Sequence, residues 1–204
     1  MKFLCLHGNG TNCNIMKIQT APLRHDLEDG HEYEFVEATL QAQMSEGVEA
    51  LSSADDAFYT FYDPKDLSTL QRSISQLDDY VRTEGPFDVV MGFSGGAILA
   101  AMYMVEVQRW GGTVPFKCGI FLSSGPSKVE RDHLGLDECY DTICVPTAHI
   151  WGANDPKGAQ DLSQMCQAAV RHMHTHDGGH ELPRKAYLTD AVHIIRRTID
   201  LANH

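Results

Sequence analysis

One pentapeptide of this chain has residue types and a spacing suited to nucleophilic chemistry. Residues 92–96 read Gly-Phe-Ser-Gly-Gly, a G-x-S-x-G pattern, with the apolar run 87–91 before it and the small-residue run 97–102 after it. These flanking runs predict a strand and a helix joined by a sharp turn, in which a side chain at either outer glycine would collide with the neighbouring element. Such a turn would present the hydroxyl of Ser94 alone at the end of a strand, ready to attack a carbonyl carbon.

A serine hydroxyl is a poor nucleophile at neutral pH, so it needs a base and an acid to orient that base. Asp155 follows the strand-like run 147–151, and His180 lies in a glycine-rich turn after the strand-like run 170–176. Each could instead be an ordinary loop residue, Asp155 as a helix cap and His180 as a surface histidine. Their order along the chain, serine then aspartate then histidine, favours a Ser-His-Asp arrangement.

A third requirement is a pair of N–H groups that receive the negative charge on the substrate oxygen. The backbone N–H of Gly95, directly after the serine, is one expected donor. The apolar run 1–6 predicts a first strand, and it is followed by His-Gly-Asn-Gly at residues 7–10. Asn9 is the preferred second donor and Gly10 the alternative, although the same four residues could form a plain tight turn.

Taken together, these motifs resemble the FSH family of serine hydrolases, which includes a human ovarian-tumour-suppressor-candidate hydrolase and fungal hydrolases of polyketide pathways. The resemblance covers nearly the whole chain and is carried by five segments: Leu6-His7-Gly8, Gly85 to Asp88, Gly92 to Ala97, Gly152 to Asp155 and Gly179-His180. It implies that Ser94, Asp155 and His180 form a triad for esterase or thioesterase chemistry. Gly95 departs from the family pattern, since many members have glutamine there. A backbone donor would be unaffected, but the pocket floor would change.

Strand-like and helix-like runs alternate along the chain, which is typical of an α/β fold with helices on both faces of a parallel sheet. We predict one α/β-hydrolase domain over residues 1–204, with a mostly parallel six-stranded sheet in the order 2-1-3-4-5-6. The predicted strands are 2–7, 33–39, 87–92, 117–123, 145–151 and 170–176, and the predicted helices are 14–28, 66–83, 96–109, 158–169 and 184–202. The order reverses between the first and third strands, where ligands of open α/β sheets bind.

Residues 40–65 show no periodic pattern, and a stretch this long within a compact domain is often functional. Phe58, Phe61 and Tyr62 within it could line the substrate pocket as a lid over an apolar acyl group. They could equally anchor the segment to the rest of the domain. The segment 128–142 is a second candidate for a pocket wall.

Charge and composition limit the partners and the compartment. Lys and Arg number 16 against 28 Asp and Glu, a formal net charge of −12, which disfavours binding to nucleic acid or to anionic membranes. The longest apolar runs have the length of strands, so neither a signal peptide nor a membrane span is predicted, and the cytoplasm is expected. The cysteines show no C-x-x-C spacing and are expected to be free thiols.

Histidines 172, 174 and 176 alternate along the last predicted strand and could in principle bind zinc. Histidines with ordinary hydrogen-bond partners are favoured, and no metal or organic cofactor is expected. The favoured function is hydrolysis of an ester or thioester. The resemblance alone favours release of a polyketide-like or fatty acyl chain. The substrate could be a small molecule or an acyl group attached to a carrier protein or synthase. Acyl transfer, peptide cleavage and a catalytically silent binding module are the alternatives. The oligomeric state is left open.

Overall fold

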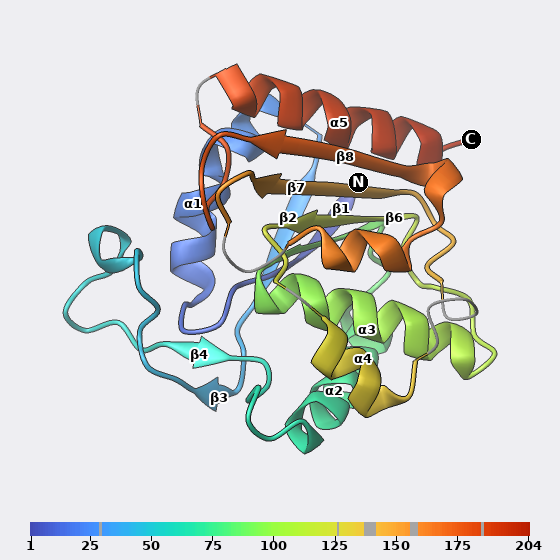
Figure 1. The fold of residues 1–204 in the computed structure, drawn as a ribbon, viewed down its shortest axis with the longest axis horizontal. Coiled ribbons are helices and arrows are strands. Elements are labelled where there is room, and N and C mark those ends of the chain that lie inside the picture. Colours follow the sequence, from blue (N-terminus) through green and yellow to red (C-terminus); the bar gives the residue numbers. More distant parts are fainter. Residues whose placement is uncertain (29, 126, 137–141, 156–158, 185) are drawn as a thin grey trace.

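A six-stranded parallel sheet forms the centre of the computed structural model, which describes residues 1–28, 30–125, 127–136, 142–155, 159–184 and 186–204 (Figure 1). Its order is β2-β1-β5-β6-β7-β8, and every neighbouring pair of strands is parallel. The bounds are β1 (Lys2–Leu6), β2 (Glu32–Val36), β5 (Val89–Phe93), β6 (Cys118–Leu122), β7 (Thr147–Gly152) and β8 (Arg171–His176). Counted within this sheet alone, the order is 2-1-3-4-5-6, and the predicted α/β fold class is confirmed.

Helices cover both faces of the sheet. The helices α1 (Cys13–Asp26) and α5 (Ala186–Ala202) pack on one face, and α2 (Ser68–Glu84) and α3 (Gly95–Arg109) pack on the other, with the short α4 (Lys128–Leu134) beside them (Figure 1). Successive side chains of a strand point to opposite faces. Along β1, Phe3 and Cys5 therefore enter the α1/α5 core, whereas Leu4 and Leu6 enter the α2/α3 core.

The helices follow from the spacing of their apolar residues and from their caps. The buried residues Leu70, Ile74, Leu77 and Val81 of α2 recur every three or four positions, so they form one stripe facing the sheet. At the start of α1, the side-chain oxygen of Asn12 accepts a hydrogen bond of 2.9 Å from the Ile15 N–H. The α3 helix is buried on all sides from residue 95 to residue 107, whereas Ser94 directly before it is half-buried.

One predicted helix is wrong. In place of a helix over 158–169, the structure has two 3₁₀ segments, η2 (Asp161–Met165) and η3 (Ala168–Val170), and residues 156–158 lie outside the described residues. The backbone here pairs with a distant segment, because the Ile143 N–H donates to the Met165 carbonyl (2.8 Å) and the Gln167 N–H donates to the Ile143 carbonyl (2.9 Å). An uninterrupted helix would need these same groups for its own hydrogen bonds.

The unpatterned segment 40–65 is built from short elements attached to the loop after β1. It contains β3 (Leu40–Gln41), η1 (Glu49–Leu51) and β4 (Tyr59–Thr60), and β3 pairs antiparallel with β4. Gly10 donates to the Tyr59 carbonyl and accepts from the Ser45 N–H, both at 2.9 Å. Gly10 has a φ of +65°, and a Cβ there would lie 2.5 Å from the Gln43 carbonyl oxygen. The segment is therefore hydrogen-bonded to the loop that carries the predicted oxyanion donor.

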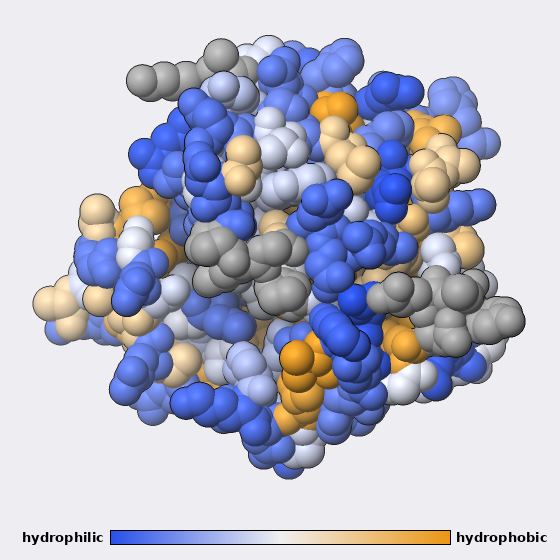
Figure 2. Space-filling view, viewed as in Figure 1, coloured by the Kyte–Doolittle hydropathy of each residue, from blue (hydrophilic) through white to orange (hydrophobic). Residues whose placement is uncertain are grey.

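The face of the molecule in Figure 2 is mostly hydrophilic, and its apolar side chains form small groups rather than one continuous patch. Within the described ranges, none of the helices has both the length and the apolar character that crossing a bilayer requires.

Candidate active site

The turn between β5 and α3 holds Ser94 in an unusual backbone conformation. Its φ of 52° and ψ of −119° are rarely adopted by residues other than glycine, at a cost of about 1–3 kcal/mol. Ideal Cβ atoms would lie 2.5 Å from the Ala97 Cα if placed on Gly92, and 2.4 Å from the Leu6 carbonyl oxygen if placed on Gly96. Both glycines are therefore needed for the close approach of β5, α3 and the end of β1, as the sequence pattern predicts.

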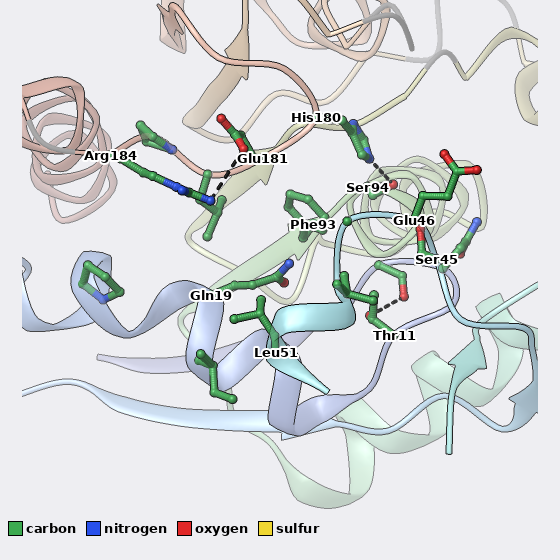
Figure 3. A pocket seen from close by; sticks show the side chains of 18 residues that line it. Thr11, Gln19, Ser45, Glu46, Leu51, Phe93, Ser94, His180, Glu181 and Arg184 are labelled. Atoms are coloured by element: carbon green, nitrogen blue, oxygen red, sulfur yellow. Dashed lines mark hydrogen bonds and ion pairs between the residues drawn. The ribbon is translucent and has the colours of Figure 1, made fainter. Parts of the chain in front are cut away.

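The structure brings Ser94, His180 and Asp155 together. The Nε2 atom of His180 lies 2.9 Å from the Ser94 Oγ (Figure 3). The Nδ1 atom of the same ring lies 2.8 Å from the Asp155 Oδ2. The Asp155 side chain is 1% exposed and the His180 side chain 19%, so solvent reaches the imidazole but hardly reaches the carboxylate. In this geometry Asp155 can fix the imidazole orientation while Nε2 accepts the hydroxyl proton.

Direct hydrogen bonds join the loop that carries Asp155 to the loop that carries His180. The Ala153 N–H donates to the His176 carbonyl (2.7 Å), and the Asn154 N–H donates to the Gly178 carbonyl (3.0 Å). The Asn154 side chain also donates to the Asp177 carbonyl (2.8 Å). A Cβ on Gly152 would lie 2.2 Å from the carbonyl oxygens of residues 178 and 179, so the two loops touch without intervening side chains.

His176, which the motifs did not assign to the site, is buried beneath the turn that carries His180 and is hydrogen-bonded to it. The His176 Nδ1 accepts from the Gly178 N–H (3.1 Å), and its Nε2 lies 3.1 Å from the Glu181 carbonyl oxygen. This pairing requires a neutral ring with its proton on Nε2. Burial lowers the pKa of His176 and so favours this neutral form. Its signal in the sequence was its place at the end of the last strand, four residues before His180.

The two residues predicted to supply the oxyanion donors, Gly95 and Asn9, both lie close to the serine. Gly95 begins α3, and the first N–H groups of a helix have no partner within the helix. The loop after β1 packs directly against the elbow, since a Cβ on Gly8 would lie 3.4 Å from the Ser94 Cβ. Asn9, the next residue, lines the same cavity as Ser94. The positions suit two donors, and the donor roles remain predictions.

His7 holds the loop after β1 in shape. Its Nδ1 lies 2.8 Å from the Gly8 carbonyl oxygen, and its Nε2 accepts from the Ala38 N–H (3.1 Å). Burial lowers the pKa of His7, and the Gly8 carbonyl and the Glu37 carboxylate oppose this effect. His7 therefore ties the loop to the chain after β2, where its Nε2 also lies 2.9 Å from the Glu37 Oε1.

Comparisons with known proteins agree with this geometry. The family described as serine hydrolase (FSH1) matches residues 1–192 of the chain. The chain belongs to this family.

Relatives of this FSH1-family hydrolase are named as esterases and hydrolases of fungi. The chain is 34% identical over 196 residues to "Esterase FPY3" of Fusarium mangiferae, covering 90% of this chain and 89% of the relative. It is 28% identical to "Hydrolase phiM" of a fungal species (strain ATCC 74256), covering 89% and 86%. A solved carboxylesterase from Mesorhizobium loti has the same fold, with a TM-score of 0.64 at 14% identity, covering 98% of this chain and 88% of that one.

A cavity of about 350 Å³ opens beside Ser94 and His180. Three segments form its walls: α1 with Ile18 and Gln19, the stretch 45–51, and residues 181–184 after the histidine. In Figure 3, Arg184 and Glu181 lie on one side, Gln19 and Leu51 on the other, and Phe93 between them. The wall 45–51 belongs to the segment 40–65 that was predicted as a possible lid, whereas the walls from α1 and from residues 181–184 were not predicted. The exposure of the apolar Ile18 (49%) on α1 marks its wall only once the structure is known.

The three aromatic residues predicted to line the substrate pocket are absent from the lining of this cavity. Phe61 and Tyr62 are 7% and 1% exposed and belong to the α2/α3 core, and the Tyr62 hydroxyl donates to Glu130 (2.8 Å). Phe58 is half-buried and also lies outside the lining. This prediction is wrong for the cavity at Ser94. Phe61 and Tyr62 anchor the segment, and the stretch 45–51 forms the wall instead.

Two other predictions from the sequence, a pocket wall at residues 128–142 and a zinc site at the histidines of the last strand, are not supported by the described residues. The described part of the segment 128–142 consists mainly of α4, which packs near α3 and does not line the cavity, and residues 137–141 lie outside the described ranges. The His172 Nδ1 lies 2.9 Å from the Thr198 hydroxyl. In the part of the chain that the structure describes, no group of three His, Cys, Asp or Glu side chains is arranged to hold a metal ion.

Proposed function

We propose that this FSH1-family hydrolase cleaves carboxylic esters or thioesters through an acyl-enzyme formed on Ser94. The observation that carries the proposal is the continuous contact from the Ser94 hydroxyl through His180 to the buried Asp155, at 2.9 and 2.8 Å. A serine of an esterase-type family with a base and an orienting acid at hydrogen-bond distance has the parts that acyl transfer needs.

The reaction would proceed in two halves. His180 takes the proton from the Ser94 hydroxyl as its oxygen attacks the substrate carbonyl, and the N–H groups of Gly95 and Asn9 receive the charge on the carbonyl oxygen. As this intermediate collapses, the C–O or C–S bond to the leaving group breaks, and the departing oxygen or sulfur takes the proton from His180 and leaves as an alcohol or a thiol. A water molecule, deprotonated by the same imidazole, then attacks the acyl-enzyme and releases the acid. Neither half requires a metal or an organic cofactor.

The cavity favours an acyl group that is mainly apolar. At about 350 Å³ it lies at the small end of the usual range for ligand pockets, about 300–1,000 Å³. Ile18, Val48, Leu51 and Leu182 supply apolar surface, and Gln19 and Arg184 supply polar groups. Among acyl donors we favour a thioester of a polyketide-like or fatty acid, presented as a small molecule or on a carrier protein or synthase. This preference is supported by the resemblance to polyketide-pathway hydrolases.

We also propose that the chain acts in the cytoplasm. All five cysteines within the described ranges are unpaired, which is usual for proteins of a reducing compartment.

Labelling with a fluorophosphonate probe, followed by product analysis, tests the proposed reaction. The chain should be labelled, and Ser94→Ala should not be labelled. With an acyl thioester in water plus an alcohol acceptor, the free acid should be the main product. An ester of the acceptor as main product would favour acyl transfer instead. The absence of both labelling and turnover would overturn the proposal in favour of a binding module.

A further inference from the structure

The side chain of Asn9 occupies the space that a side chain at residue 95 would take. An ideal Cβ on Gly95 would lie 2.1 Å from the Asn9 Oδ1, 2.6 Å from its Cγ and 2.8 Å from its Nδ2. Real Cβ atoms do not approach heavy atoms this closely, so any residue other than glycine at 95 must displace the amide of Asn9. Gly95 and Asn9 are also the two residues whose backbone N–H groups are the proposed oxyanion donors.

A threonine on β4 fixes the Asn9 side chain in this place. The Thr60 Oγ1 lies 2.8 Å from the Asn9 Oδ1 and 2.8 Å from the Tyr62 carbonyl oxygen, and Thr60 is 8% exposed. The residue before it, Tyr59, is hydrogen-bonded through its backbone to Gly10 (2.9 Å) and Thr11 (2.8 Å). Thr60 is therefore held on the same strand that clamps the oxyanion loop, and it contacts that loop through a side chain.

We infer that Thr60, Asn9 and Gly95 form one positioning unit for the oxyanion hole. The Thr60 hydroxyl orients the Asn9 amide, the amide packs over Gly95, and this contact sets the distance between the two backbone N–H donors. In this chain, where the Asn9 side chain fills the space beside residue 95, a side chain at 95 would push Asn9, and with it one donor, away from the serine. The inference rests on the proposed function and assigns to residues 59–60 a role in catalysis through the oxyanion loop.

A double substitution tests the contact between Asn9 and Gly95. Gly95→Ala should lower kcat by about 10²-fold, the usual effect of losing one oxyanion donor, with a small change in KM. Adding Asn9→Gly to that variant removes the amide that the new methyl group displaces and keeps the backbone N–H. The double variant should recover at least about tenfold in kcat, whereas Asn9→Gly alone should lower kcat. A loss of kcat in Gly95→Ala that arises from any cause other than the contact with Asn9 would show no such recovery.

Substitutions at Thr60 test the other contact without touching the oxyanion donors. Thr60→Val keeps the shape and removes the hydroxyl, so kcat for a p-nitrophenyl ester should fall about 5- to 10-fold, the factor expected for one hydrogen bond. Thr60→Ser should retain most of the activity. Thr69→Val is the matched control, because the hydrogen bonds of the Thr69 hydroxyl are to the backbone of Asp63 and Asp66 and not to Asn9. Thermal unfolding of each variant shows whether the fold is kept.

The outcomes separate this inference from the proposed function. Residual activity of Ser94→Ala near that of the parent would overturn the serine mechanism itself. Two results would overturn the positioning unit while Ser94→Ala is inactive. One is a kcat of Gly95→Ala equal to that of the parent. The other is a folded Gly95→Ala variant whose kcat does not rise when Asn9→Gly is added. If Gly95→Ala fails to fold, the Thr60 variants test the inference instead. Equal kcat values for Thr60→Val and Thr60→Ser would contradict it.

Discussion

Two aspartates lie near His180, and their surroundings differ sharply. The Asp155 side chain is 1% exposed and reaches the imidazole at 2.8 Å. Asp177 is exposed, and the interaction it contributes to this region is made by its backbone carbonyl, which accepts from Asn154 (2.8 Å). Distance and burial therefore support Asp155 over Asp177 as the partner of His180.

Asp155→Asn should therefore lower kcat by about 10⁴-fold, because an amide in place of the carboxylate favours the wrong imidazole tautomer. Asp177→Asn serves as the matched control and should change kcat by less than about twofold, since its backbone carbonyl is retained. Initial rates on one ester substrate measure both. A larger loss from Asp177→Asn than from Asp155→Asn would show that the acid is misassigned.

At the scale of elements, the ends of β7 and β8 act as one support for the acid and the base. Gly152→Ala should drive the two loops apart, because its Cβ would lie 2.2 Å from the carbonyl oxygens of residues 178 and 179. A shift of about 1 Å in positioned groups can lower turnover about 10²-fold. The control is Gly30→Ala, which introduces backbone strain at a φ of +99° in open space away from the site. Equal kcat for the two variants would argue against the support.

The walls supplied by α1 and η1 should select the length of the acyl chain. Each buried methylene contributes about 0.8 kcal/mol, so kcat/KM should rise with chain length until the cavity is filled. Ile18→Ala and Leu51→Ala should flatten this rise while sparing acetyl esters. Phe58→Ala, in the same segment as Leu51 but outside the lining, is the control. If only Phe58→Ala weakened the dependence of kcat/KM on chain length, the acyl group would bind outside this cavity.

The sequence predicted that Ser94, Asp155 and His180 would lie together because each belongs to a local pattern. The glycines around Ser94 are forced by contacts within a few residues and with one neighbouring strand, and Asp155 and His180 follow recognisable strands. The cavity walls had no such pattern. β3 and β4 are two residues long each, and they form because Tyr59 and Ser45 pair with the distant loop at Gly10. Aromatic content alone could not show that Phe61 and Tyr62 point into the core instead of the pocket.

The mistaken helix over 158–169 has a related cause. The apolar side chains of Leu162, Met165 and Cys166 are buried, as they would be in a helix. The backbone at Cys166, however, pairs with Ile143, about twenty residues earlier in the chain. Local propensity cannot anticipate such a partner, and tertiary contacts override it.

For the molecule as a whole, a buried histidine links stability to pH. His149 lies on β7 inside the sheet, its Nδ1 has no hydrogen-bond partner among the described residues, and burial lowers its pKa from 6.5 to about 3. Below pH 6.5 the unfolded chain binds a proton at this site that the folded chain does not bind. The free energy of unfolding therefore falls as the pH drops from 6.5 towards 3, by at most about 1.4 kcal/mol per pH unit from this group.

His149→Phe should reduce this slope, because phenylalanine does not titrate and can pack against Phe121, whose ring centroid is 5.1 Å from that of His149. Urea unfolding between pH 4 and pH 7 measures the slope for each variant. The exposed His25→Gln variant should keep the slope of the parent. An unchanged slope in His149→Phe would mean that other groups carry the pH dependence.

The order of the strands along the chain determines when the parts of the site come together during synthesis on the ribosome. Ser94 and the loop at Asn9 belong to neighbouring strands, β5 and β1, which can pair once about half of the chain has emerged. Asp155 and His180 come at the ends of β7 and β8, the last two strands to be made, and they reach the serine after both have joined the edge of the sheet. The growing polypeptide thus carries the Ser94 turn without His180 while residues 95–179 are being made. A chain cut short before residue 180 would have the elbow and no base.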